Sequence, residues 1–266
     1  MEDPLTLLEL ARTIAEEAGR LLVEGRPGNL GVQRTKSSPT DVVTEMDLAA
    51  ERLIRRRIAA ARPQDGFLGE EDGEQPGTSG VVWVVDPIDG TVNYLYDLPG
   101  WAVSIGVEVD GVAVAGVVLA PRLGEVFTAS LGGGARCNGR PLAARPAAGL
   151  AAALVATGFG YLAERRERQG AIASALLPRV RDLRRDGSAA LDLCAVAAGR
   201  LDGYFERGTQ RWDRSAGGLI AAEAGGVVAG FHGAGPSEAM TLAAPAGTFT
   251  VLHDALVELG ADRPDY

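Results

Sequence analysis

The composition of this chain is that of a globular protein with little affinity for nucleic acids. It has 266 residues, of which 46% are hydrophobic and 23% charged, and this length can bury a large core. The formal net charge of -9 disfavours nonspecific contact with a nucleic-acid backbone, so nucleic acid is not an expected partner. The same charge repels a phosphate substrate unless cations are bound in the site.

The start of the chain and its cysteines indicate the cellular compartment, and its histidines indicate which kind of metal site is possible. The acidic first residues lack the basic and apolar regions of a secretory signal, and no apolar run approaches the roughly 20 residues that span a membrane. Cys137 and Cys194 fit the free thiols of a reduced, cytoplasmic protein. His232 and His253 each stand alone, so any metal is expected to be hard and bound by oxygen.

The first half of the chain is expected to begin with two helices and to continue in strands. Apolar residues from Leu7 to Leu21 recur at helical spacing, and Gly25 follows. Thr44 and Asp47 form a capping-box pattern at the start of the second helix. The expected elements are a helix over about 7–21, an extended segment 31–43, a helix from 44 to before Pro63, a buried strand 81–85, and a hairpin of 101–109 and 112–119.

The second half is expected to mix helices and strands, after a composition shift near residues 140 to 150. We place a boundary there between an N-terminal α+β half, 1–145, and a C-terminal α/β half, 146–266, which completes the site. The expected elements are strands at 154–157, from Tyr204–Phe205, at 227–228 and at 249–252, with helices at 162–177, 189–199 and 214–224.

Three acidic clusters lie where turns or helix starts are expected: Gly69 to Asp72, Asp86 to Thr91, and Trp212-Asp213. Exposed acids are common, so the first cluster could be a solvated loop, and Asp213 could serve only as a helix N-cap. The second cluster is harder to explain as surface, because its two acids bracket Pro-Ile directly after a buried strand. Carboxylates converging at strand ends would suit a hard cation such as Mg²⁺.

These motifs resemble those of the inositol monophosphatase family, in particular its bacterial members. Asp86 to Thr91 resembles the first family signature, and Trp212 to Gly217 resembles the second. The resemblance runs in order over about residues 5 to 255. The other matching pieces are Lys36 to Asp41, Thr44 with Asp47, Gly69 to Glu71, Trp101 to Gly106, Gly134-Ala135 with Asn138-Gly139, and Gly187 to Ala190.

The resemblance implies a fold, a metal set and an oligomeric state. The fold would be a layered α-β-α-β-α sandwich, of the kind shared by inositol monophosphatases and fructose-1,6-bisphosphatase-like enzymes, usually assembled as a homodimer. Each site would hold two or three Mg²⁺ ions. The implied ligands are Glu70, Asp86, the backbone carbonyl of Ile88, Asp89 and Asp213.

The resemblance also implies the reaction, which is hydrolysis of inositol 1-phosphate or a similar small polyol phosphate by metal-activated water. Glu70, Thr91 and Asp47 would be catalytic, with Thr91 and Asp47 orienting the water, and inhibition by lithium is expected. The residues implied to contact the substrate are Asp89, Gly90, Thr91, Gly187, Ser188, Ala189, Glu206 and Asp213.

Several alternatives stay open at this point. The same chemistry could act on histidinol phosphate, fructose 1,6-bisphosphate, NADP or adenosine bisphosphate. The protein could instead be a regulatory partner of the RNA or transcription machinery, docking through Arg165-Arg166 and Arg184-Arg185. Lys36 could be solvated or part of a mobile cap over the site. Arg214 and Ser215 depart from the family pattern, and Arg214 could project to solvent or add positive charge near the leaving group.

Overall fold

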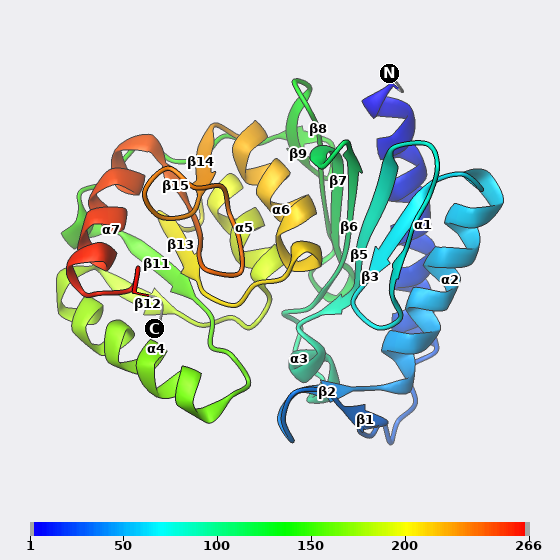
Figure 1. Cartoon of the computed structure of the whole chain (residues 1–266), viewed down its shortest axis with the longest axis horizontal. Coiled ribbons are helices and arrows are strands. Elements are labelled where there is room, and N and C mark those ends of the chain that lie inside the picture. Colours follow the sequence, from blue (N-terminus) through cyan, green and yellow to red (C-terminus); the bar gives the residue numbers. More distant parts are fainter. Residues whose placement is uncertain (1–2, 264–266) are drawn as a thin grey trace.

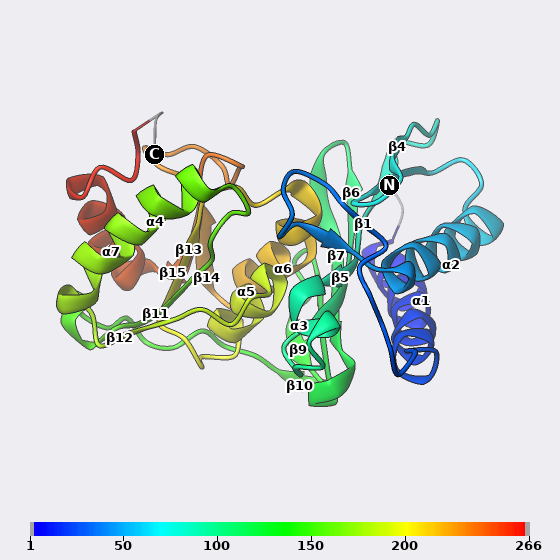
Figure 2. The same cartoon turned by 90° about the horizontal axis from the view of Figure 1, so that it is seen from below.

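The computed structural model of the chain describes residues 3–263 and has two β-sheets separated and flanked by helices (Figure 1). Viewed from below, the same layers run from one end of the molecule to the other (Figure 2). The order is helix, sheet, helix, sheet, helix, as expected for the layered sandwich. None of the helices within residues 3–263 combines the length and apolarity that a membrane crossing requires.

The larger sheet has eight strands in the order β10-β9-β8-β7-β6-β5-β3-β4, and all pairs except β3 with β5 are antiparallel. Its strands are β3 (Gly66–Gly69), β4 (Gly73–Gln75), β5 (Val81–Asp89), β6 (Ala102–Val109), β7 (Val112–Ala120), β8 (Glu125–Ser130), β9 (Gly134–Cys137) and β10 (Arg140–Pro141). The predicted hairpin is β6 and β7, joined across Asp110 at a φ of 50° and Gly111 at 80°.

The smaller sheet has five strands in the order β12-β11-β13-β15-β14, with β11 parallel to both of its neighbours. Its strands are β11 (Leu154–Thr157), β12 (Asp182–Arg184), β13 (Gly203–Glu206), β14 (Gly226–Ala229) and β15 (Thr241–Pro245). A separate two-stranded ribbon pairs β1 (Arg34–Thr35) with β2 (Val42–Val43) at the edge of the site. The division of the chain at residue 145 falls between the two sheets and stays a prediction.

Helices supply the other three layers. One pair packs on the outer face of the large sheet, one pair lies between the sheets, and one pair covers the small sheet. In that order they are α1 (Pro4–Glu24) with α2 (Glu45–Ala61), α5 (Ala189–Ala197) with α6 (Arg211–Glu223), and α4 (Ala163–Leu176) with α7 (Ala246–Glu258). The short α3 (Thr91–Leu95) follows β5, and single 3₁₀ turns occupy Pro121–Leu123, Leu150–Ala152 and Leu177–Arg179.

Local sequence explains where the first two helices begin. Asp3 caps α1, since its carboxylate accepts from the backbone N–H of Leu5 at 3.1 Å, and Pro4 tolerates the first helical position because no donor is lost there. Thr44 and Asp47 form the predicted capping box of α2. Both helices bury one apolar face against the large sheet.

One predicted strand was wrong. Residues 249–252 belong to α7, and the strand of this region is β15, which ends at Pro245. The apolar run from Thr241 to Leu252 contains both elements, and periodicity does not separate a buried strand from a buried helix in so short a run. In the structure Pro245 separates the two elements, because it ends β15 and is the N-cap residue of α7.

Glycines allow α6 to lie unusually close to the large sheet. Gly106 on β6 is paired with Gly116 on β7, and both face α6. A Cβ atom at Gly116 would lie 3.0 Å from both the Cα and the carbonyl oxygen of Ala216, and one at Gly106 would lie 2.3 Å from Ser215 Oγ. The start of α6 therefore depends on this sheet surface for its position.

We expect Gly116→Ala to lower the free energy of unfolding by about 1–3 kcal/mol, because the new methyl group meets backbone atoms that must shift. Denaturant unfolding checks this, with Gly170→Ala as control, since Gly170 lies in α4 with open space around its Cα. Equal stability of the two variants would contradict the close-packing argument.

Candidate functional site

The first two carboxylates of the site stand at the end of strand β5. The pairing of β5 with β6 shifts register between Asp86 and Asp89, so the strand end is irregular there. The Asp86 carboxylate accepts from the backbone N–H of Ile88 at 2.9 Å, which braces the turn through Pro87. Gly90 follows with a φ of 95°, a left-handed conformation that favours glycine, and serves as the N-cap of α3.

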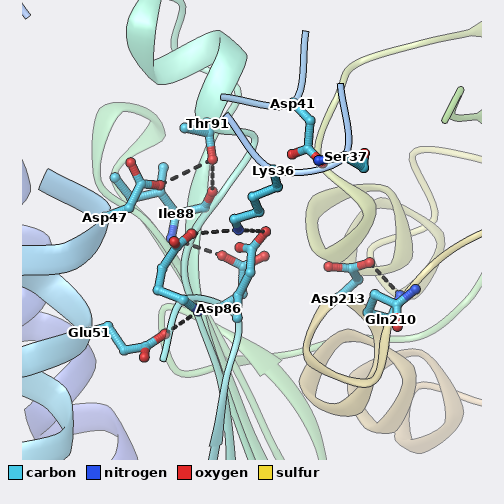
Figure 3. A network of polar contacts seen from close by, with 12 residues as sticks. Lys36, Ser37, Asp41, Asp47, Glu51, Asp86, Ile88, Thr91, Gln210 and Asp213 are labelled. Atoms are coloured by element: carbon cyan, nitrogen blue, oxygen red, sulfur yellow. Dashed lines mark hydrogen bonds and ion pairs between the residues drawn. The ribbon is translucent and has the colours of Figure 1, made fainter. Parts of the chain in front are cut away.

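The third carboxylate, Asp213, comes from the first turn of α6 (Figure 3). Asp213 is not the N-cap residue of this helix, which was the alternative interpretation from the sequence. The helix begins at Arg211 with Gln210 as its N-cap, and Asp213 is the third helical residue, whose Oδ2 accepts from the Gln210 N–H at 2.6 Å. One oxygen is therefore engaged in the cap, and the side chain still faces the other two carboxylates.

Oxygens of Asp86, Asp89 and Asp213 lie within 4.8 Å of one another. Burial raises the pKa of all three carboxyls, and their mutual repulsion together with the charge of Glu70 adds to the effect. The pKa of Asp89 rises to about 6 even though Ser188 and Ala190 hydrogen-bond to it. Such a set of hard oxygens fits a divalent cation, which would remove the repulsion.

The α5 N-terminus holds Asp89 in place from the other half of the chain. Its Oδ2 accepts from Ser188 Oγ at 2.5 Å and from the Ala190 N–H at 2.7 Å. Ser188 is also the N-cap of α5, where it accepts from Leu191. The family resemblance predicts that Ser188 contacts the substrate. It did not reveal this contact to Asp89, because no local pattern links residues about a hundred positions apart.

Lys36 reaches into the site from the loop between β1 and β2. Its Nζ lies 2.8 Å from Glu70 Oε1 and 2.7 Å from Glu71 Oε1. Burial opposes the charge of the ammonium, but the two glutamates outweigh it and raise the pKa of Lys36. A freely solvated lysine is therefore excluded in this conformation. Glu51, which sequence patterns did not single out, holds the turn between β3 and β4 that carries Glu70 and Glu71, by accepting from the N–H groups of Glu71 and Asp72.

Thr91 joins Asp47 to the end of β5. Its hydroxyl lies within donating distance of both Asp47 Oδ1, at 3.2 Å, and the Ile88 carbonyl, at 3.0 Å. The other Asp47 oxygen accepts from the N–H and hydroxyl of Thr44, at 2.7 and 2.6 Å. Burial raises the pKa of Asp47 to about 7, against these hydrogen bonds from Thr44. Asp47 thus belongs to a capping box and also contacts the site.

A cavity of about 490 Å³ opens over these groups. It is lined by every site residue expected from the sequence except Asp47, which reaches it through Thr91. Glu206 lies at one side and accepts from Tyr204 Oη at 3.0 Å, and burial raises its pKa to about 7. The lining residues that sequence reasoning did not place in the site include Phe159, Tyr161, Arg207 and Trp212.

The two departures from the family pattern lie outside this cavity. Arg214 neither projects freely nor reaches the cavity, since its guanidinium donates to the Thr209 carbonyl at 2.6 Å and burial lowers its pKa. Ser215 is buried and donates to Glu108 Oε1 at 2.7 Å, beside the ion pair of Glu108 with Arg211. Both residues fasten the start of α6 to its surroundings.

The five-layer α/β fold and its carboxylate-lined cavity occur in a chain whose family match places it in a class of phosphatases. The family model for the inositol monophosphatase family matches residues 3–259, and the chain belongs to that family. It is a phosphatase of the inositol-phosphate type.

Named relatives are similar over most of their length. The "Inositol-1-monophosphatase SuhB" of Mycobacterium tuberculosis (strain ATCC 25618 / H37Rv) is 45% identical over 249 residues, covering 84% of this chain and 83% of the relative. The "Nus factor SuhB" of Escherichia coli (strain K12) is 42% identical over 229 residues, covering 85% and 86%. The crystal structure of the extragenic suppressor protein suhB from Bartonella henselae superposes with a TM-score of 0.88 at 37% identity, covering 94% and 98%.

The raised pKa values predict how pH and metal act on stability. Because the folded pKa of Asp89 is about 6, its contribution to the stability of metal-free protein is present below the ordinary pKa and is lost as pH rises through about 6. A divalent cation competes with those protons. The increase in thermal unfolding midpoint caused by Mg²⁺ should therefore be larger at about pH 8 than at about pH 5.

The matched variant for this measurement is Asp213→Asn, which removes one of the three charges. Its metal-free form should be more stable than the parent at about pH 8, and Mg²⁺ should stabilise it less. An Mg²⁺ effect that does not depend on pH in the parent protein would contradict the assignment.

Proposed function

We propose that this protein is a Mg²⁺-dependent phosphomonoesterase that hydrolyses inositol 1-phosphate or a similar small polyol phosphate with water as the nucleophile. The observation that carries the proposal is the convergence of Asp86, Asp89 and Asp213 within 4.8 Å at one wall of the cavity. The mycobacterial relative named an inositol-1-monophosphatase supports the choice of substrate.

Two or three Mg²⁺ ions would be held by Glu70, Asp86, the carbonyl of Ile88, Asp89 and Asp213. Magnesium fits because all of these donors are oxygens and because no histidine lines the cavity. When bound, the ions neutralise phosphoryl oxygens, lower the pKa of water and stabilise the leaving oxygen. Ser188 and Ala190 fix the direction of the Asp89 carboxylate, so the ligand set is partly pre-organised.

Thr91 and Asp47 would orient the attacking water. With its proton donated toward Asp47, the Thr91 hydroxyl oxygen is left to accept a hydrogen bond from that water. Asp47, whose pKa is raised to about 7, can share the proton that the water gives up. The backbone N–H groups of Gly90 and Thr91 would contact the phosphate, which would lie against the same wall of the cavity.

The polyol would occupy the part of the cavity lined by Gly187, Ser188, Ala189 and Glu206. Tyr204 engages one oxygen of Glu206, and the other is available to accept from ring hydroxyls. Gly158 makes room for this carboxylate, since a Cβ there would lie 1.9 Å from its Oε2.

The deciding experiment is phosphate release from a panel of compounds, with and without Mg²⁺. We expect release from inositol 1-phosphate that depends on Mg²⁺ and exceeds release from histidinol phosphate, fructose 1,6-bisphosphate, NADP and adenosine bisphosphate. Release from histidinol phosphate but none from inositol 1-phosphate would overturn the substrate and leave the chemistry standing. No release from any compound would overturn the proposal.

Asp89→Asn and Asp213→Asn are each expected to lower kcat/KM by about a thousandfold or more, since metals contribute several kcal/mol of transition-state stabilisation. Circular dichroism should show that both variants remain folded. Asp254→Asn, an exposed change on α7 away from the cavity, is the control and should retain full activity. Near-normal activity in either site variant would refute the metal set.

A regulatory role in the RNA or transcription machinery is a second candidate, supported by the E. coli relative that is named a Nus factor. Of the arginine pairs considered for docking, Arg166 is engaged with the Tyr161 carbonyl and Arg184 with Asp182, whereas Arg165 and Arg185 line the cavity. We rank this role second because it leaves the carboxylate cluster without a use. Homodimer formation and lithium inhibition remain predictions from family membership, and a cytoplasmic location remains a prediction from the sequence.

A further inference from the structure

Three arginines line the cavity without a part in the reaction proposed above, and of these Arg207 donates to the Arg263 carbonyl. Arg165 comes from α4 and Arg185 follows β12, and both line the cavity together with the proposed polyol contacts Gly187 and Glu206. Neither is needed to hold metal, to orient water or to bind ring hydroxyls. The question is therefore which ligand group their charges would meet.

Arg185 presents an uncommitted guanidinium. Within residues 3–263 no hydrogen bond or ion pair engages it, although the residue is exposed to the cavity. Its Nη1 lies against Gly187, where an added Cβ would approach to 2.6 Å, and the left-handed Gly187, with a φ of 91°, leaves that space open. Burial raises the pKa values of Glu206 and Asp192, and the charge of Arg185 offsets part of that rise, which places its guanidinium near the polyol end.

Arg165 is positioned but weakly paired. Its side chain crosses two glycines, since a Cβ at Gly160 would lie 2.6 Å from its Cδ and one at Gly208 would lie 2.7 Å from its Nη1. Its ion-pair partner among the described residues is Glu238, at 3.9 Å, and that side chain is 60% exposed. Water screens so long and open a contact, and the guanidinium can therefore turn to a better acceptor.

The two buried acids nearby, Glu206 and Asp192, oppose these charges only in part. Burial raises the pKa of Glu206 to about 7 and that of Asp192 well above its usual range. The metal-binding carboxylates would be neutralised by their own cations. Arg165 and Arg185 therefore keep two guanidinium groups available at the polyol end of the cavity, and the planar donor geometry of these groups matches the oxygens of a phosphate.

We propose that Arg165 and Arg185 form a subsite for a second phosphate carried on the leaving group, so that an inositol bisphosphate is preferred to the matching inositol monophosphate. This inference rests on the proposed function, because the first phosphate must be the one hydrolysed at the carboxylate cluster. A dianionic phosphate held by two guanidinium groups from separate elements would displace Glu238 from Arg165. It would also fix the ring across the cavity.

The test compares inositol 1-phosphate with inositol 1,4-bisphosphate, which places a second phosphate across the ring. With Mg²⁺ the parent protein should show a kcat/KM about tenfold or more higher for the bisphosphate. Arg185→Ala and Arg165→Ala should each remove about tenfold of this preference, mainly through KM, and change the monophosphate by less than about twofold. Arg185→Lys should retain part of the preference, because lysine keeps the positive charge but lacks the planar guanidinium that donates two parallel hydrogen bonds.

Arg168→Ala is the matched control, since it removes the same charge from α4 at a position outside the cavity lining. It should leave both substrates unchanged. Equal kcat/KM for the two compounds in the parent, or equal losses on both in Arg185→Ala, would overturn the subsite and leave the phosphatase proposal intact. Failure to release phosphate from either compound would overturn both.

Discussion

Three acidic side chains confined to one small volume are the constraint around which this protein is built. Asp86 and Asp89 arrive on a strand and Asp213 on a helix, and their oxygens lie within 4.8 Å. Like charges withdrawn from water repel strongly, and the raised pKa values record that cost. The arrangement persists because apolar packing elsewhere holds β5 and α6 together. The cluster lowers the stability of the metal-free fold and favours binding of a cation.

The helical layer between the sheets is what brings the elements together. On one side, α6 approaches the large sheet over Gly106 and Gly116, closely enough that its backbone nearly touches the strands. On the other side, α5 presents Ser188 and the Ala190 N–H to Asp89. Because both helices pack on both sheets, the position of each carboxylate is set by contacts that cross the middle of the molecule.

Charge is distributed unevenly along the cavity. The end formed by β5 and α6 is acidic and suited to cations, and Lys36 supplies the one ammonium among the cavity-lining residues of the described chain. The opposite end is formed by the segments around Gly160, Gly187 and Gly208, where arginine side chains lie over glycines. A ligand that bridges the two ends would meet carboxylates at one of its groups and guanidinium groups at the other. Such a cavity would distinguish the two ends of a ligand by electrostatics as well as by shape.

Local patterns determined much of this protein from the sequence alone: the capped helices, the buried strand before Asp86, the β6–β7 hairpin and the motifs that place the chain in its family. Each depends on residues a few positions apart, whose spacing is legible in the chain. Only the tertiary structure decided that 249–252 is helical, that Ala190 holds Asp89, and that Arg165 and Arg185 face the cavity. The physical reason is that these outcomes follow from packing between distant segments, where the energy of a contact is not encoded in any local period.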